Sequence, residues 1–102
     1  MKLAPAELQL VHRILRKHAP GYPVWAFGSR VHGRNLKPFS DLDLAVISDE
    51  PLRLDDLIAL RRAFSESDLP FRVDVVDYAA ADVGFRSIIK AEHEIVTAGP
   101  EN

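Results

Sequence analysis

The sequence contains no cysteine among its 102 residues, which excludes disulfide bonds and metal sites built from thiolates. No apolar run approaches the roughly 20 residues that a membrane-spanning helix needs, so no membrane segment is expected. The formal net charge is −2, and a chain without excess basic residues lacks the electrostatic field typical of nucleic-acid-binding domains. Direct binding of nucleic acid or of a membrane is therefore not expected.

The composition that remains is that of an ordinary globular protein, with 47% hydrophobic and 27% charged residues. The length suits one domain over residues 1–102 and leaves little material for a second functional lobe. The first ten residues lack the long apolar core of a signal peptide. A cytoplasmic location is therefore expected.

Hydrophobic periodicity alternates between helical and strand patterns along the chain. Apolar residues spaced at helical intervals predict helices over residues 4–20, 54–67 and 79–96. Short apolar or alternating runs predict strands over residues 24–27, 41–47 and 71–77. This order predicts an α/β (α+β) fold, a small mixed β-sheet flanked by helices.

The last predicted helix has its own expected details. Asp77 is expected to cap its N-terminus, because a short carboxylate can accept a hydrogen bond from a free backbone N–H. Its expected buried stripe consists of Phe85, Ile88, Ile89, Ile95 and Val96. Residues 97–102 are expected to form a frayed tail.

Two aspartates lie one residue apart in the most apolar predicted strand. Side chains at i and i+2 of a strand point to the same side, so Asp41 and Asp43 project together, opposite Leu42 and Leu44. Two close carboxylates repel each other, and a cation removes that penalty. An oxygen-rich site favours a hard ion, Mg²⁺ or Mn²⁺, which usually also binds substrate phosphate oxygens. For Asp41 alone, a turn or cap at the strand start is an equal alternative.

The residues directly after the first predicted strand suit a phosphate cradle. Gly28 allows a backbone to approach a phosphate without a Cβ in the way. Ser29 offers a hydroxyl and is expected to cap a short helix, whose free N–H groups attract anions. Arg30 adds a positive charge nearby. The alternatives are a plain strand-to-helix turn for Gly28 and Ser29, and a solvated surface arginine for Arg30.

A third carboxylate, Asp74, interrupts the predicted strand 71–77. If the two acidic strands are neighbours in the sheet, Asp74 completes a cluster of three carboxylates. Such a cluster could hold two metal ions about 3.5–4 Å apart. The alternative is a salt bridge from Asp74 to Arg72 or to a helix lysine.

Taken together, these motifs resemble the nucleotidyltransferase superfamily of the DNA polymerase β type. The match comprises Gly28-Ser29, Gly33, then Ser40-Asp41-Leu42-Asp43 before apolar residues, and Asp74 in a later strand. The short length makes the chain most similar to the minimal nucleotidyltransferases, the MNT proteins. The resemblance extends over nearly the whole chain and implies the nucleotidyltransferase fold.

The resemblance also implies roles for these residues. Gly28 and Ser29 would bind the nucleotide triphosphate of ATP, with Arg30 and Ser40 beside them. Asp41, Asp43 and Asp74 would be the catalytic and metal-binding residues for Mg²⁺ or Mn²⁺. MNT proteins usually act on a small helical HEPN toxin as its antitoxin, transferring AMP from ATP onto a tyrosine of the toxin.

Three functional classes stay open from the sequence. The first is an enzyme that transfers AMP to a partner protein in a toxin–antitoxin system. The second is a non-catalytic antitoxin that neutralises its partner by binding alone. The third is a nucleotidyltransferase for a small molecule, such as an antibiotic hydroxyl, that works as a dimer. The homo- or hetero-oligomeric state is likewise left open.

Overall fold

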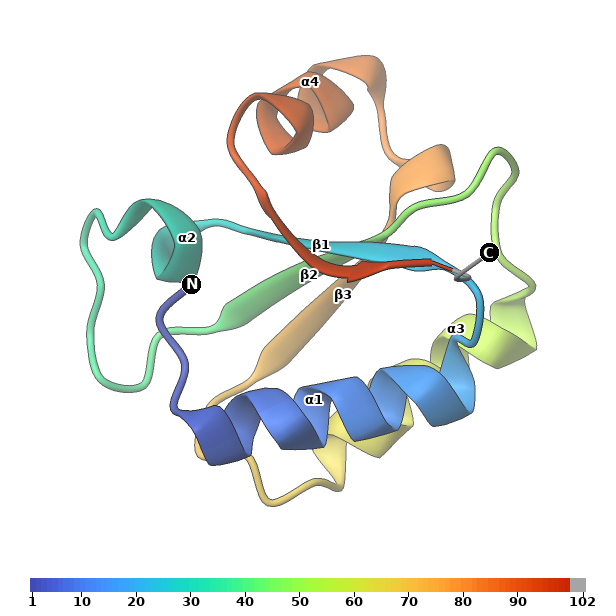
Figure 1. Ribbon diagram of the computed structural model, residues 1–102. Coiled ribbons are helices and arrows are strands. Elements are labelled where there is room, and N and C mark those ends of the chain that lie inside the picture. The colour runs from blue at the N-terminus through green and yellow to red at the C-terminus, as the bar shows by residue number, and fades with distance from the viewer. Residues whose placement is uncertain (100–102) are drawn as a thin grey trace.

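The computed structural model describes residues 1–99, which form a four-stranded sheet with helices on both faces (Figure 1). In the spatial order β3-β2-β1-β4, the strands are β1 (Pro23–Phe27), β2 (Leu42–Val46), β3 (Val73–Asp77) and β4 (Glu94–Ala98). The helices are α1 (Pro5–His18), α2 (Ser29–His32), α3 (Leu54–Ser65) and α4 (Val83–Ala91), with a 3₁₀ turn η1 (Tyr78–Ala80). This architecture confirms the predicted mixed sheet with flanking helices.

Strand directions bring three chain segments to one end of the sheet. β1 runs antiparallel to both β2 and β4, whereas β2 and β3 run parallel. Parallel neighbours need a long crossover, and α3 supplies it. β1 therefore ends where β2 and β3 begin, and the register pairs Phe27 with Asp43 and Asp43 with Asp74.

One face of the sheet is closed by α1 and α3, which lie together below it in Figure 1. Alternation along β2 directs Leu42, Leu44 and Val46 into this core, and all three are fully buried. The predicted stripe of α3, Leu57, Leu60 and Phe64, is buried, and so are Val11, Ile14 and Leu15 of the predicted stripe of α1. Leu8, the remaining member of that stripe, is only partly buried. Within residues 1–99, no helix is both long and apolar enough to cross a membrane.

The opposite face, which carries Asp43 and Asp74, is covered more thinly. Its apolar cluster has three buried members, Phe27, Ala45 and Ile89. Ile89 is the one buried residue of α4, the helix above the sheet in Figure 1. Trp25 extends this cluster, since its ring stacks on His93 at 3.9 Å and meets Tyr78 edge-on at 5.7 Å.

The prediction of one long helix over residues 79–96 is wrong. α4 ends at Ala91, Glu92 has extended backbone angles, and β4 then pairs with the outer edge of β1. Without β4, the edge of β1 would carry unpaired N–H and C=O groups. The run Ile95, Val96, Thr97 is β-branched and suits the strand that satisfies them.

Several details of the last predicted helix are corrected with it. Of the expected buried stripe, Ile89 is buried and Val96 partly so, but Ile88 and Ile95 are 67% and 63% exposed and Phe85 is 36% exposed. Residues 97 and 98 of the expected frayed tail belong to β4. Residues 100–102 of that tail lie outside the described part of the chain.

Asp77 is not the cap of α4. The cap is Asp82, whose Oδ1 accepts a 2.8 Å hydrogen bond from the backbone N–H of Phe85. Asp77 is instead buried at the end of β3, where its Oδ2 accepts from the backbone N–H of Leu52 at 2.8 Å. Its carboxylate therefore fixes the loop that leads into α3.

Candidate active site

The carboxylates singled out by the sequence lie at one end of the sheet. Asp43 and Asp74 are direct partners in the parallel register of β2 and β3. Asp41 precedes Asp43 by two residues and lies directly before the first residue of β2, Leu42. The condition set from the sequence, that the acidic strands be neighbours, is met.

The electrostatics of this end centre on Asp43. The pKa of its half-buried carboxyl is raised from 3.8 to about 6, first by burial and then by the charges of Asp74 and Asp41. The group therefore holds its proton to a higher pH than a free aspartate does. Such a raised pKa next to two further carboxylates is typical of functional sites.

Asp74 also pairs with Arg72, the alternative that the sequence left open. Arg72 Nη2 lies 3.6 Å from Asp74 Oδ1, but the two side chains are 80% and 46% exposed. An ion pair this accessible to water contributes little to stability. The carboxylate of Asp74 therefore stays available at the same end as Asp43.

Gly28 links β1 to α2 directly beside Asp43. Its backbone adopts φ 78° and ψ −160°, a conformation essentially confined to glycine. A Cβ at this position would overlap Oδ2 of Asp43 and lie 3.2 Å from its Cγ. The sequence predicted that Gly28 approaches a phosphate, and that stays a prediction; the structure places a carboxylate oxygen of Asp43 nearest to its missing Cβ.

Ser29 does not cap α2 as expected. Gly28 is the cap residue, and its carbonyl accepts hydrogen bonds from the N–H groups of Val31 and His32 at 2.9 and 3.1 Å. Ser29 is the first residue of the helix, and no side-chain capping bond forms there. Its partly exposed hydroxyl is therefore not used by the helix and lies one residue beyond the glycine that touches Asp43.

The structure gives Arg30 a different place from the phosphate contact expected from the sequence. Arg30 is only 6% exposed, and its guanidinium donates to the backbone carbonyls of Ser40 at 2.8 Å, Lys2 at 2.7 Å and Pro38 at 3.2 Å. The surface-arginine alternative is wrong as well. These contacts make Arg30 an internal brace of the loop between α2 and β2.

Ser40 lies in the same loop. Its hydroxyl accepts from the backbone N–H of Lys37 at 2.8 Å, and its carbonyl accepts from Arg30. The hydroxyl is thus engaged in the loop that ends at Asp41. Its place supports a role in shaping the site, and a nucleotide contact from Ser40 remains a proposal.

The donor set can be compared with the needs of a divalent ion. Within residues 1–99, no three acidic, histidine or cysteine side chains converge tightly enough to form a ready metal site. The chemistry of the donors nevertheless fits a hard cation, because the charges that act on Asp43 are the carboxylates of Asp74 and Asp41, which together with burial raise its pKa. A cation between them would relieve their repulsion.

One residue near the site was missed from the sequence. The ring of Phe85 in α4 packs edge-on against Phe27 at 5.7 Å, and Phe27 directly precedes Gly28. The sequence places Phe85 on the buried stripe of a helix, and its spacing carries no sign that α4 borders the acidic end. A cavity of about 490 Å³ lies elsewhere, between α1 and β4, and is lined by none of the predicted site residues.

Comparison with known proteins adds a family and a set of relatives. A family model described as polymerase beta, nucleotidyltransferase matches residues 9–101. A Haemophilus influenzae protein named probable protein adenylyltransferase MntA is 51% identical over 90 residues, which cover 88% of this chain and 78% of the relative.

Two solved structures share the fold. A crystal structure of a toxin–antitoxin with AMP-PNP superposes with a TM-score of 0.72 at 23% identity, covering 88% of this chain and 72% of the other. A complex of a tri-AMPylated Shewanella oneidensis HEPN toxin with its MNT antitoxin superposes with a TM-score of 0.65 at 20% identity, covering 90% and 70%. These likenesses confirm the fold that the sequence motifs implied.

Proposed function

The chain belongs to the polymerase β-type nucleotidyltransferase family, and from that membership we propose that it transfers AMP from ATP to a hydroxyl group of a partner protein. The observation that carries the proposal is the pairing of Asp43 with Asp74 beside Gly28, with Asp41 two residues away. The 51% identity to a protein named as a probable protein adenylyltransferase supports the same chemistry.

The reaction balances as a displacement at the α-phosphorus of ATP. The acceptor hydroxyl oxygen forms a bond to that phosphorus, the bond to the bridging oxygen of the β-phosphate breaks, and pyrophosphate leaves. The hydroxyl proton passes to a carboxylate, for which Asp74 at the outer edge of the acidic group is the candidate. Asp41 and Asp43, which are negative like the triphosphate, would hold the cation that brings the triphosphate to this end of the sheet.

We propose Mg²⁺ or Mn²⁺ as the ion of this site, held by Asp41, Asp43 and Asp74. When bound, such an ion neutralises phosphate charge and polarises the reacting phosphorus centre. These three side chains offer only oxygen donors, and the carboxyl of Asp43 has a raised pKa. Binding of the ion would release any proton held by Asp43.

The phosphate cradle of the proposal comprises Gly28 and Ser29, with Ser40 at its border. Gly28 lacks the Cβ that would overlap the carboxylate of Asp43, and Ser29 has a hydroxyl that no helix cap uses. Arg30 is not part of this set, because its guanidinium is buried among backbone carbonyls.

We propose a small helical HEPN-type toxin as the acceptor, with a tyrosine hydroxyl as the modified group, so that the chain acts as an antitoxin. The support is the fold shared with an MNT antitoxin that was solved in complex with an AMPylated HEPN toxin. A cytoplasmic location belongs to the same proposal, since the reaction consumes ATP.

The test is transfer of labelled AMP to a small helical protein encoded beside this chain. Wild-type protein, Asp43→Asn and the control Asp49→Asn are each incubated with the partner, Mg²⁺ and ATP labelled at the α-phosphate. Asp49 is exposed in the loop after β2 and serves as a matched loss of one charge. We expect intact-mass spectrometry to show AMP on the partner with wild type and with Asp49→Asn.

Transfer by Asp43→Asn is expected to fall by a factor of at least about 100, as when a charge-stabilising group is removed from an active site. A partner whose toxicity is suppressed while its mass stays unchanged would contradict the enzyme and favour neutralisation by binding. Label on a small-molecule hydroxyl, with none on the protein, would favour the third functional class.

A further inference from the structure

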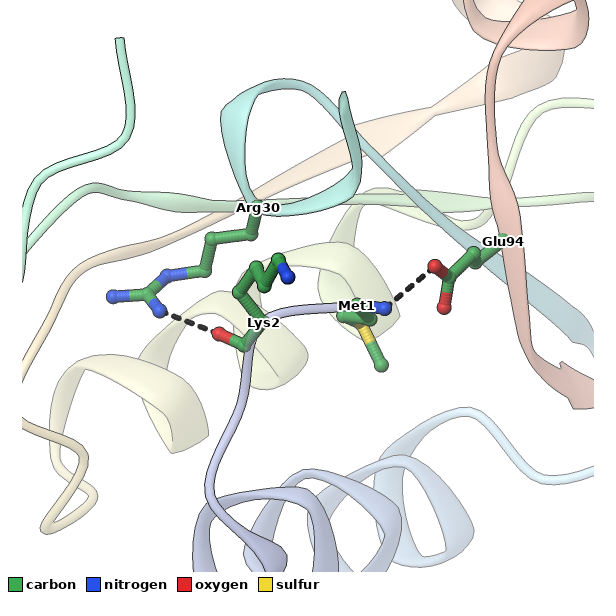
Figure 2. Close-up of polar contacts among 4 residues, drawn as sticks. All are labelled: Met1, Lys2, Arg30 and Glu94. Carbon is green, nitrogen blue, oxygen red and sulfur yellow. Dashed lines mark hydrogen bonds and ion pairs between the residues drawn. The ribbon is translucent and has the colours of Figure 1, made fainter. Parts of the chain in front are cut away.

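Arg30 reaches three separate parts of the chain from the centre of α2. Its Nε donates to the carbonyl of Ser40 at 2.8 Å, and its Nη2 donates to that of Pro38 at 3.2 Å. Its Nη1 donates to the carbonyl of Lys2 at 2.7 Å, as Figure 2 shows. With 6% exposure, the guanidinium is sealed from solvent and satisfied by backbone oxygens.

The fourth contact of Arg30 is a cation–π contact. Its Cζ lies 4.0 Å from the centre of the Phe71 ring, and Phe71 is itself buried. Phe71 leads into β3, which carries Asp74, and the next carbonyl, of Arg72, accepts from the N–H of Leu42 at 2.9 Å. Arg30 therefore touches the segments just ahead of both acid-bearing strands.

The N-terminal segment encloses Arg30 from the remaining side. The backbone N–H of Lys2 donates to the carbonyl of Arg30 at 2.8 Å, so the two residues are joined in both directions. The backbone nitrogen of Met1 pairs with Glu94 Oε1 at the start of β4 (Figure 2). This segment is thereby fixed between α2 and β4.

We propose that Arg30 is a positioning residue, which sets Asp41 and Asp74 relative to Gly28 by bracing the starts of their strands. The carbonyl of Ser40 belongs to the peptide bond that joins Ser40 to Asp41. Its hydrogen bond from Arg30 therefore fixes the position of the Asp41 backbone. The loop over residues 33–41 contains no helix or strand of its own. A displacement of about 1 Å in a reacting group can lower a rate by about 100-fold.

The chemistry of the side chain makes this role specific to arginine. A guanidinium is a planar fork that donates in several fixed directions, whereas a lysine ammonium is a compact point charge. Lysine at position 30 could keep the charge but could not hold Ser40, Pro38 and Lys2 together. The conservative variant Arg30→Lys is therefore expected to fail.

The first experiment measures AMP transfer and rests on the proposed function. Arg30→Lys is compared with wild type and with Arg62→Lys, an exposed arginine of α3. We expect kcat to fall by about 10- to 100-fold in Arg30→Lys while KM for ATP changes less than about threefold. A raised KM with unchanged kcat would mean that Arg30 binds nucleotide, and unchanged values of both would mean that it only supports the fold.

The second experiment needs no activity, so it separates this inference from the proposed function. Amide hydrogen exchange is followed in the metal-free protein at Ser40 and Leu42, whose N–H groups donate to Lys37 and Arg72. We expect exchange at both amides to become at least about tenfold faster in Arg30→Lys, with Leu60 in α3 unchanged. Retained protection at Ser40 and Leu42 would overturn the inference even if transfer is lost.

A second variant keeps the test decisive if Arg30→Lys does not fold. Phe71→Leu retains the guanidinium and its hydrogen bonds but removes the ring at 4.0 Å. We expect amide exchange at Ser40 and Leu42 to be faster than in wild type here too, but only by about threefold. Exchange equal to wild type at both amides would contradict the proposed brace.

Discussion

The face of the sheet beneath α1 and α3 is packed with apolar side chains, whereas the opposite face carries the carboxylates and a helix with one buried residue. Leu42, Leu44 and Val46 point to the first face and are fully buried. Asp43 and Ala45, which alternate with them, point to the second. A single strand thus contributes to stability on one side and to the candidate site on the other.

The difference shows how a small chain can keep a charged site. The closed face supplies most of the apolar burial, so the other face can hold three close carboxylates despite their repulsion. It can also leave Val83 and Ile88 of α4 exposed. Matched substitutions on the two faces test whether stability comes mainly from the closed face and the candidate site from the other.

The largest expected effect on stability lies on the closed face. Leu60→Ala removes a side chain that is 1% exposed and is expected to lower the free energy of unfolding by about 3 kcal/mol. Ile88→Ala on the opposite face removes a similar volume at 67% exposure and is expected to cost less than about 0.5 kcal/mol. Urea unfolding measures both, and equal losses would mean that α4 is buried against something in solution.

The next largest effect on stability is expected at Gly28, which links β1 to α2 beside Asp43. Gly28→Ala places a methyl group in a backbone conformation that only glycine adopts readily and against the carboxylate of Asp43. We expect Gly28→Ala to lower the free energy of unfolding by about 2 kcal/mol, measured by urea unfolding. Gly33→Ala is the control, because Gly33 has a similar φ of 79° but open space around its missing Cβ, and about 1 kcal/mol is expected there.

A double-mutant cycle isolates the collision from the backbone strain. In an Asp43→Ala background the carboxylate oxygen is absent, so Gly28→Ala should cost about 1 kcal/mol less than it does in wild type. If the effects of Gly28→Ala and Asp43→Ala on the free energy of unfolding are additive, the methyl group does not contact Asp43. The predicted collision between them is then wrong.

The smallest expected effect is the pH dependence of Asp43. Its pKa in the folded chain is about 6 against an ordinary 3.8, so the folded protein holds this proton more tightly than the unfolded chain does. The free energy of unfolding is therefore expected to fall as pH rises from about 4 to about 6, and to level off above. Because the group is half exposed, the total change is about 1 kcal/mol.

Asp43→Asn removes that dependence. In EDTA, the variant is expected to match wild type near pH 4 and to be about 1 kcal/mol more stable above pH 6, with Asp49→Asn unchanged relative to wild type. Thermal melts across this range provide the measurement. A variant less stable than wild type at pH 7 would show that the carboxylate has a stabilising partner.

Much of the fold follows from local patterns in the sequence. The stripes of α1 and α3 and the alternation of β2 determine their own elements, because a helix of period 3.6 and a strand of period 2 bury different residues. The same alternation brings Asp41 and Asp43 to one side. The sequence therefore predicted these three elements and the acidic pair without knowledge of their neighbours in the fold.

Tertiary structure decided the features that depend on a second segment. Residues 94–98 form a strand because β1 has an open edge, and the β-branched residues of this run favour a strand only where such an edge is available. Asp77 binds Leu52 rather than capping α4 because the chain folds back at that point.

Arg30 shows the same division most clearly. Its sequence position, after a glycine and a serine, is equally compatible with a phosphate contact and with a solvated surface. Its guanidinium is buried only because residues 2, 38, 40 and 71 pack around it in the folded chain. Residue type and local spacing fixed the acidic strands of this protein, whereas partners distant in the chain decided which charges are exposed and which are buried, because burial depends on the whole fold.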